Sequence, residues 1–224
     1  MKLLKNEKIE FISIIIILFL IYFYLLATNY TYAVSKDLSN SVLRLHILAN
    51  SNSNEDQELK YKVRDNIINY MNSITKNIDS KEEALRIAKE NESEFISIAK
   101  QTIRDNGFDY DVNINFGNFY FPTKTYGDIS LPAGEYDAIR IEIGESQGQN
   151  WWCVMFPPLC FVDISSGIVP DDSKKQLKDT VSDEDFYLIS NGNSNNSTDG
   201  FIKIKFKLIE FFNNANILTA NNKD

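Results

Sequence analysis

The pattern of hydrophobic and polar residues separates the first 33 residues from the rest of the chain. Residues from Phe11 to Leu26 are apolar apart from Ser13, three lysines precede them, and small and polar residues follow as far as Ala33. This order of charge, apolar stretch and small residues is typical of an export signal. The apolar run spans roughly 24 Å at about 1.5 Å per residue, a little less than the roughly 30 Å of a bilayer core. We therefore expect residues 1–33 to be a signal peptide or membrane anchor, and the short run favours cleavage after Ala33.

Beyond this segment, the periodicity indicates one strand followed by two helices. Apolar and polar residues alternate over residues 42–49, which predicts a strand. Ser53 is positioned to cap a helix whose apolar residues recur at every fourth position up to Met71. Ser80 begins a second helix, which we expect to end at Gly107 because glycine tolerates the left-handed conformation that follows a helix.

After Gly107 the period changes to two. Alternation predicts strands over residues 112–116, 139–143 and 151–156, and we expect the segment 144–150 to join the last two as a glycine-containing hairpin. The resulting order, β-α-α-β-β-β, predicts an α+β fold in which a small, mainly antiparallel sheet packs against two helices. We place this domain at residues 40–163.

The C-terminal part of the chain has a weaker pattern. Residues 164–200 lack periodicity and end in a stretch rich in Asn, Ser and Gly, so we expect a mobile loop or linker there. Apolar residues alternate with lysines over residues 201–212, which predicts a terminal strand. Residues 213–224 are interpreted as a tail.

Charge and composition exclude several classes of function. The chain has 31 acidic and 23 basic residues, a formal net charge of −8, which disfavours binding to nucleic acid or to an anionic membrane surface. We therefore expect membrane contact only through the N-terminal segment. Two cysteines and one histidine are too few for a Cys/His structural zinc site, and we expect no metal and no cofactor. The single histidine also limits acid–base chemistry near pH 7.

Two sequence patterns partly match catalytic or ligand motifs. Residues Gly144–Gly148 read Gly-Glu-Ser-Gln-Gly, as in a hydrolase nucleophile elbow, but that motif needs a helix after it and a histidine later in the chain, and His46 lies upstream. Asp109 begins a pattern like that of a calcium loop, but Ile114 and Tyr120 occupy the positions where glycine and glutamate are needed. We interpret the first pattern as a turn and the second as a strand.

Abundant carboxylates leave an enzymatic alternative open. A glycosidase needs two carboxyl groups held about 5 to 9 Å apart, which a sequence does not reveal. The candidates near aromatic residues are Asp128, Glu135, Asp137, Glu142 and Glu145. A secreted cell-wall hydrolase is therefore one alternative, and a cell-wall-binding module with an aromatic platform is another. We assign no catalytic residue.

The two cysteines allow two interpretations. The segment between Cys153 and Cys160 contains Pro157 and Pro158, which could turn the chain back and bring the sulfur atoms together. Export permits oxidation, and two is the right number for one disulfide bond. Two buried reduced thiols are the alternative.

Two adjacent tryptophans mark the same region. In a strand, Trp151 and Trp152 must point to opposite faces, so we expect one of them to belong to the core. The other needs either a cover, such as the 163–200 segment, or a binding partner, because exposed tryptophan is enriched at binding hot spots.

Several stretches resemble the stage II sporulation protein R family. They lie within residues 40–163, and the tryptophan–cysteine stretch is the most specific of them. The stretches are LRLHILANSNS (43–53), EDQELK (55–60), KVRD (62–65), FPTKTYG (121–127), LPAGEY (131–136) and GQNWWCVMFPPLCFVD (148–163).

The resemblance implies a signalling role without enzymatic activity. Proteins of this family are made in the forespore of a sporulating bacterium and exported into the space between forespore and mother cell. There they activate a membrane-embedded aspartic protease of the mother cell, which cleaves the precursor of sigma-E. The sequence agrees with an activator, because it has neither an Asp-Thr-Gly nor an Asp-Ser-Gly motif of its own.

An activator must bind the active state of its receptor more tightly than the inactive state. Reversing a 1:99 population requires about 5.5 kcal/mol of differential binding, which aromatic anchors with a polar rim can supply. We expect the segments 121–126 and 150–160 to form this surface, although they could instead form an unusual core. The candidate interaction residues are Trp151, Trp152, Tyr126, Phe121, Pro157 and Pro158.

Overall fold

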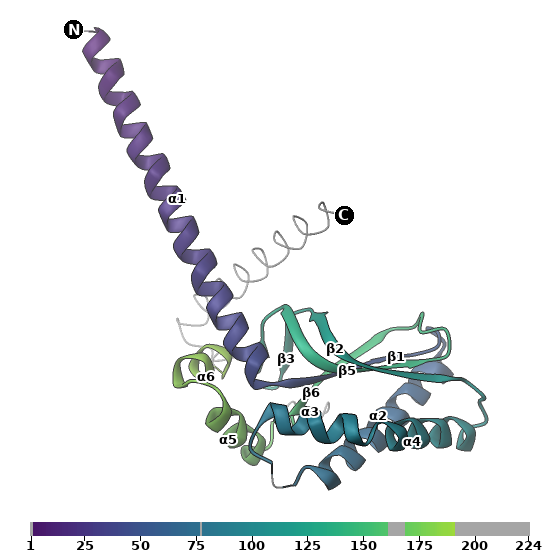
Figure 1. The fold of residues 1–224 in the computed structure, drawn as a ribbon. Helices are drawn as coiled ribbons and strands as arrows, with labels where there is room; N and C mark the ends of the chain where they lie inside the picture. Colours follow the sequence, from purple (N-terminus) through teal and green to yellow (C-terminus); the bar gives the residue numbers. More distant parts are fainter. Residues whose placement is uncertain (1, 77, 161–168, 191–224) are drawn as a thin grey trace.

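The computed structural model describes residues 2–76, 78–160 and 169–190, with side chains for all of these except residues 2–10 and 27–35. The helices are α1 (Lys2–Ser41), α2 (Asn54–Ile74), α3 (Lys81–Glu90), α4 (Glu92–Asp105), α5 (Asp171–Thr180) and α6 (Asp183–Ser190). The strands are β1 (Leu43–Leu48), β2 (Val112–Phe121), β3 (Lys124–Tyr126), β4 (Ile129–Leu131), β5 (Gly134–Ile143) and β6 (Asn150–Phe156). Figure 1 shows α2, α3 and α4 below the sheet, while α1 leaves the domain on the opposite side.

The main sheet has four strands in the order β2-β5-β1-β6. The central pair, β1 and β5, is parallel, whereas β2 and β6 pair antiparallel with their neighbours. Strands β3 and β4 form a separate antiparallel pair. The predicted α+β class is confirmed, but the predicted strand order omitted this pair, and three helices rather than two cover the sheet.

Helices begin where the sequence places capping residues. The Ser53 hydroxyl accepts a hydrogen bond from the Asp56 amide at 3.2 Å, and Ser80 caps α3 in the same way. The predicted helix from Ser80 to Gly107 is divided at Asn91. The Asn91 side-chain amide donates to the Ile87 carbonyl at 2.8 Å and caps the end of α3, and α4 begins at the next residue.

The predicted hairpin between β5 and β6 is wrong, because β1 lies between these two strands. The connecting residues 144–149 instead cross the end of β1. Gly148 donates from its N–H to the Ala49 carbonyl at 2.9 Å, and a Cβ at Gly148 would overlap the Ser51 carbonyl. Glycine is needed here because the crossing brings two backbones into close contact.

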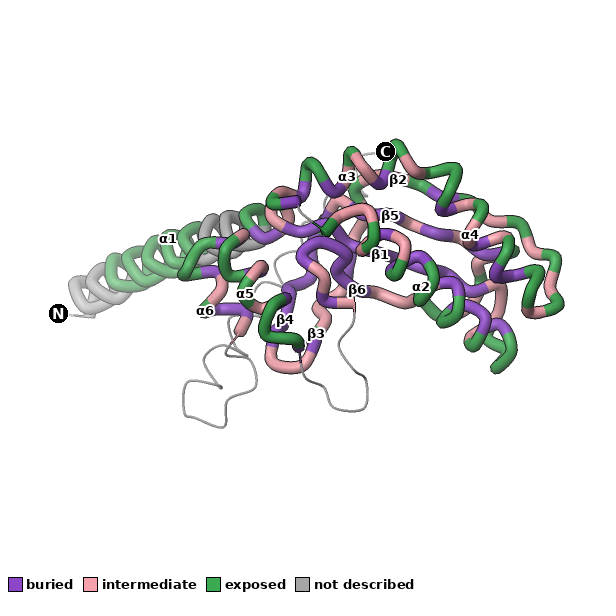
Figure 2. Tube along the Cα trace, turned by 90° about the horizontal axis from the view of Figure 1, so that it is seen from below, coloured by how far each residue is buried: buried purple, intermediate pink, exposed green. Residues whose placement is uncertain are grey.

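Strand β1 is buried on both faces. Its residues Leu43, Leu45 and Ile47 belong to the hydrophobic core with residues of α2 such as Leu59 and Val63. The residues between them, among which is Arg44, face away from these helices and are also buried. In Figure 2, buried residues predominate in the central strands and in the β3–β4 pair.

Helix α1 joins the domain without an intervening loop. Its apolar side chains from Phe11 to Leu26 are exposed, whereas Leu38 near its C-terminal end is fully buried. The Lys81 ammonium donates to the Ser39 carbonyl at 3.2 Å, which fixes the last turn of α1 to α3. Within the described part of the chain, no helix combines the length and the apolar character that crossing a membrane requires.

The segment predicted as a loop at residues 164–200 contains two helices, α5 and α6, which lie beside the base of α1 (Figure 1). Lys174 of α5 forms an ion pair with Asp128, at the turn between β3 and β4, at 2.8 Å. The predicted terminal strand (201–212) and tail (213–224) lie outside the described residues.

Candidate interaction site

Arg44 lies at the centre of the sheet face that points away from α2–α4. It is fully buried, and its Nη2 donates to the Tyr126 hydroxyl at 2.7 Å. The guanidinium carbon lies 4.2 Å from the centre of the Phe121 ring and 4.8 Å from that of Tyr136, within the range of cation–π contacts. Nε and Nη1 have no hydrogen-bond partner among the described residues. Aromatic rings rather than a carboxylate therefore surround this buried charge.

His46 continues the same face of β1 beyond Arg44. Its ring stacks on Trp152 with centroids 3.6 Å apart and planes inclined by 15°. His46 Nε2 lies 2.8 Å from Asn150 Oδ1, an arrangement in which Nε2 carries the proton and donates it. Burial is the main cause that lowers the pKa of His46, from 6.5 to about 4. At neutral pH this side chain is therefore uncharged.

Trp152 connects the two buried residues to the surface. It is half-buried, and its ring meets that of Phe121 edge to face at 4.6 Å. The Tyr126 hydroxyl donates to its carbonyl oxygen at 3.3 Å. Trp152 thus has its backbone and one ring face fixed, while part of its ring is available to a partner.

A polar row extends this face across the sheet towards β2. Arg140 and Glu142 of β5 form an ion pair at 2.8 Å. Asn113 and Asn115 of β2 donate to the same glutamate at 3.1 and 3.3 Å. Arg140 aligns with His46 in the register between β5 and β1, so the row lies directly beside the aromatic residues.

Trp151 points to the opposite face, as its neighbour Trp152 requires. It meets Tyr61 edge to face at 5.5 Å, and the guanidinium of Arg64 lies 4.3 Å from its ring centre. The indole N–H is buried and has no acceptor within the described residues. We expected one tryptophan to belong to the core; both are half-buried and pack against it.

The structure corrects part of the predicted interaction surface. Phe121, Tyr126 and Pro157 are buried, so they support the surface from below and cannot contact a partner without rearrangement. Trp151, Trp152 and Pro158 are half-buried and accessible.

Of the two interpretations of the cysteines, the structure shows the disulfide bond. Cys153 and Cys160 are joined, with their Cα atoms 5.1 Å apart. The intervening turn contains a cis peptide bond between Phe156 and Pro157.

Sequence reasoning missed the residues at the centre of the site. Arg44 and His46 alternate with leucines in the first strand, a pattern that is typical of a solvated strand face. The signal that could have revealed their burial is the number of aromatic residues in the later stretches, because Phe121, Tyr136 and Trp152 cover the two polar side chains. Four separate stretches of the sequence therefore meet at one place.

The patterns that partly matched catalytic motifs have structural roles. Residues Gly144–Gly148 form the connection over β1, and β6 rather than a helix follows them, so the geometry of a nucleophile elbow is absent there. The strand interpretation of the calcium-like pattern is confirmed, since β2 begins at Val112.

Three of the five candidate carboxylates each form an ion pair with a different cation. Asp137 contacts Lys81 at 2.7 Å, Glu142 contacts Arg140, and Asp128 contacts Lys174. Hydrogen bonds from Lys81 and Asn118 hold the pKa of Asp137 below its usual value, although burial acts in the opposite direction. The first pairing joins β5 to α3 and the third joins the β3–β4 turn to α5, while the second lies within β5, so these three carboxylates have structural partners.

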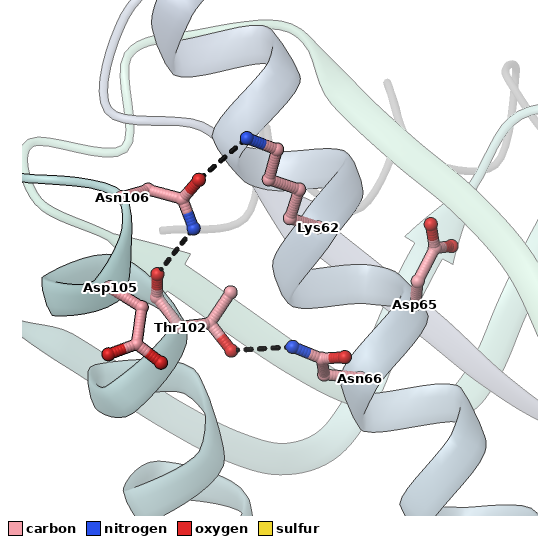
Figure 3. A pocket seen from close by; sticks show the side chains of 6 residues that line it. All are labelled: Lys62, Asp65, Asn66, Thr102, Asp105 and Asn106. Carbon is pink, nitrogen blue, oxygen red and sulfur yellow. Dashed lines mark hydrogen bonds between the residues drawn. The ribbon is translucent and has the colours of Figure 1, made fainter.

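A pocket of about 280 Å³ lies between α2 and α4 (Figure 3). Its lining residues are Lys62, Asp65, Asn66, Thr102, Asp105 and Asn106. Lys62 donates to the Asn106 side chain at 2.6 Å, and Asn66 donates to the Thr102 hydroxyl at 2.8 Å. These bonds join the two helices and use the polar groups that a ligand would otherwise bind.

Comparison with known proteins shows which family the sequence resembles. Residues 39–166 match the family described as Stage II sporulation protein R. The chain is 41% identical over 152 residues to the stage II sporulation protein R of Bacillus subtilis (strain 168), an alignment that covers 65% of this chain and 68% of the relative. No solved structure matches the chain. The match covers more than half of the residues, and the chain belongs to the stage II sporulation protein R family.

Proposed function

We propose that this protein is an exported signal of sporulation, which leaves the forespore through its N-terminal segment and acts in the space between forespore and mother cell. There it activates a membrane-embedded aspartic protease of the mother cell, and that protease cleaves the sigma-E precursor. The chain itself supplies binding energy and no catalytic group. Family membership supports the role in sporulation, and the apolar run from Phe11 to Leu26 supports export.

One observation carries the assignment of the binding surface. Four of the stretches that resemble the family contribute to the sheet face opposite α2–α4, where Arg44 and His46 are buried under aromatic rings and Trp152 is partly accessible. A large aromatic side chain fixed by its neighbours loses little conformational freedom on binding, which is the property of an interface anchor. We infer that Trp152 and the polar row beside it contact the protease.

Activation by binding requires a difference in affinity between two receptor states. If the inactive state predominates by 99:1, a difference of about 5.5 kcal/mol between the binding free energies of the two states reverses the ratio. Loss of one central aromatic anchor typically costs 2 kcal/mol or more, roughly a 30-fold change in affinity. A loss of about 2 kcal/mol at Trp152 therefore lowers the ratio of active to inactive receptor from 99:1 to about 3:1, and a larger loss lowers it further.

The test uses the two adjacent tryptophans as a matched pair. The full chain, the protease and the sigma-E precursor are expressed together in a bacterium that does not sporulate, and precursor cleavage is followed on an immunoblot. We expect cleavage to require the chain, to be reduced with Trp152→Ala and to be unchanged with Trp151→Ala, because the latter side chain faces α2.

Two controls test folding. One is the variant Trp152→Phe, and the other is the amount of exported protein that contains the disulfide bond. Cleavage without the chain would contradict the proposal. Normal cleavage with Trp152→Ala would remove this residue from the interface.

A further inference from the structure

The two edges of the four-stranded sheet are protected to different degrees. At the β6 edge, the Val154 carbonyl accepts a hydrogen bond from the Leu159 N–H at 3.0 Å, and the Trp152 carbonyl accepts one from Tyr126. The turn that contains Pro157 and Pro158 folds back beside this strand, and the disulfide bond fixes it there. These contacts block the addition of another strand at β6.

The β2 edge differs from the β6 edge in the residues that the structure describes, because β2 has no charge, proline or bulge. Strand β2 has the sequence VNINFGNFYF, without a charged residue or a proline. It pairs with β5 through ten consecutive residues, from Val112 opposite Ile143 to Phe121 opposite Gly134, without a bulge. Within residues 2–76, 78–160 and 169–190, no strand pairs with its outer side. Long, regular and uncharged edges of this kind are templates for strand addition.

We propose that two copies of this chain pair through β2, antiparallel to each other, and form one continuous sheet across a two-fold axis. The absence of charge favours the chain's own copy, because a charged strand placed opposite itself would bring like charges together. Pairing through β2 removes both unprotected edges at once. The blocked β6 strands then become the two outer edges, so the assembly closes at two chains.

The direction of α1 is compatible with this assembly. Helix α1 leaves the domain on the side of the sheet opposite to α2–α4 (Figure 1). A two-fold axis perpendicular to the sheet keeps both α1 helices on the same side. Two paired copies can therefore direct their N-terminal segments towards one membrane. The polar row that includes Asn115 also continues from one copy into the other, which doubles the candidate interaction face.

Cysteine cross-linking of the full exported chain tests the pairing. Asn113, Asn115 and Asn118 are exposed on β2 and are replaced by cysteine one at a time, while Gln101→Cys, exposed on α4, is the matched control. Both native cysteines are in a disulfide bond, so each variant has a single free thiol. On a non-reducing gel we expect a disulfide-linked dimer that is strongest at one β2 position, the one nearest the axis, and weaker at the others.

A charge at the edge provides a second, independent measurement. Asn115→Lys, added to the variant that cross-links best at another β2 position, places like charges across the axis, and we expect several-fold less dimer. Gln101→Lys adds the same charge elsewhere and should leave the dimer unchanged. Cross-linking no stronger on β2 than at Gln101→Cys would overturn the proposal. So would a dimer that forms only after removal of residues 191–224, because the chain's own C-terminal part would then cover this edge.

Discussion

At the scale of the residue, Arg44 shows how a charge is kept inside this small domain. Burial of a guanidinium costs the free energy of its hydration. Here no carboxylate is paired with it, and one hydroxyl and two aromatic rings compensate for this cost only in part. Desolvated cation–π contacts contribute about 2 kcal/mol each, which is comparable with the several kcal/mol of lost hydration. We conclude that Arg44 is close to neutral for stability and acts mainly to align the rings that support Trp152.

Two substitutions at Arg44 distinguish the effect of its charge on stability from the effect of its volume. Arg44→Met keeps most of the volume and removes the buried charge, so we expect the free energy of unfolding to stay within about 2 kcal/mol of that of the native chain. Arg44→Ala leaves a cavity beneath the rings and should cost roughly 3 kcal/mol or more. Urea unfolding measures both. Equal destabilisation by the two variants would show that the charge itself stabilises the fold.

His46 makes stability depend on pH in a defined window. Its pKa is 6.5 in the unfolded chain and about 4 in the folded one, so between these values the unfolded chain binds more protons. Stability contributed by neutral His46 is therefore complete above pH 6.5 and is lost as the pH falls towards 4, by up to about 3 kcal/mol.

As the only histidine, His46 can be followed by the NMR signal of its ring proton. We expect a titration midpoint near 4. The difference in unfolding free energy between the native chain and His46→Gln should shrink over the same range. A midpoint near 6.5 would contradict the stacked and buried geometry.

At the scale of the element, the crossing between β5 and β6 determines the sheet order. Residues 144–149 pass over the end of β1, and the backbone of Asn50 and Ala49 receives their N–H groups. The Lys60 ammonium also reaches this connection, donating to the Gln149 carbonyl at 2.9 Å. Burial lowers the pKa of Lys60 to about 8, so this contact carries a charge at neutral pH.

A comparison of two glycines tests the crossing. Gly148→Ala places a Cβ against the Ser51 carbonyl and should cost about 3 kcal/mol of unfolding free energy, because two backbones must separate. Gly107→Ala has a positive φ of 82° but no atom within 4 Å of the new Cβ, so only backbone strain of about 1 kcal/mol is expected. Thermal or urea unfolding distinguishes them. A Gly107→Ala variant as unstable as Gly148→Ala would show that contact at the crossing is unimportant.

The sequence allowed prediction of those features that depend on local pattern. The caps at Ser53 and Ser80, the apolar stripe of α2 and the core of the strands all follow from spacing and capping chemistry. The position of β1 between β5 and β6 could not be predicted from the spacing of residues in the sequence, because the order of strands depends on contacts between distant segments. The break at Asn91 was missed because Asn91 is fixed by Tyr70, a residue of another helix.

The candidate site was predictable to a lesser extent. Trp152 stands out by its size and position, and the disulfide bond by the two prolines between the cysteines. Burial of Arg44, Phe121 and Tyr126 depends on how β3–β4 packs over the sheet. Each of these two strands has three residues, which is too short for a hydrophobic period that would predict this packing.

At the scale of the whole molecule, the domain and its N-terminal helix form a continuous unit. Leu38 is fully buried in the core and Lys81 contacts the end of α1, so the domain begins before the first strand. Cleavage after Ala33 would leave this buried turn intact. The proposed signal therefore carries its complete binding face whether the apolar segment is kept or removed.

Our proposal requires that the protein act from outside the cell membrane, by contact. The most direct measurement compares two chains in the same non-sporulating host that contains the protease and the sigma-E precursor: the full chain and a chain lacking residues 2–33. We expect precursor cleavage with the full chain and none with the shortened one, provided that both accumulate as folded protein. Equal cleavage by the chain retained inside the cell would contradict it.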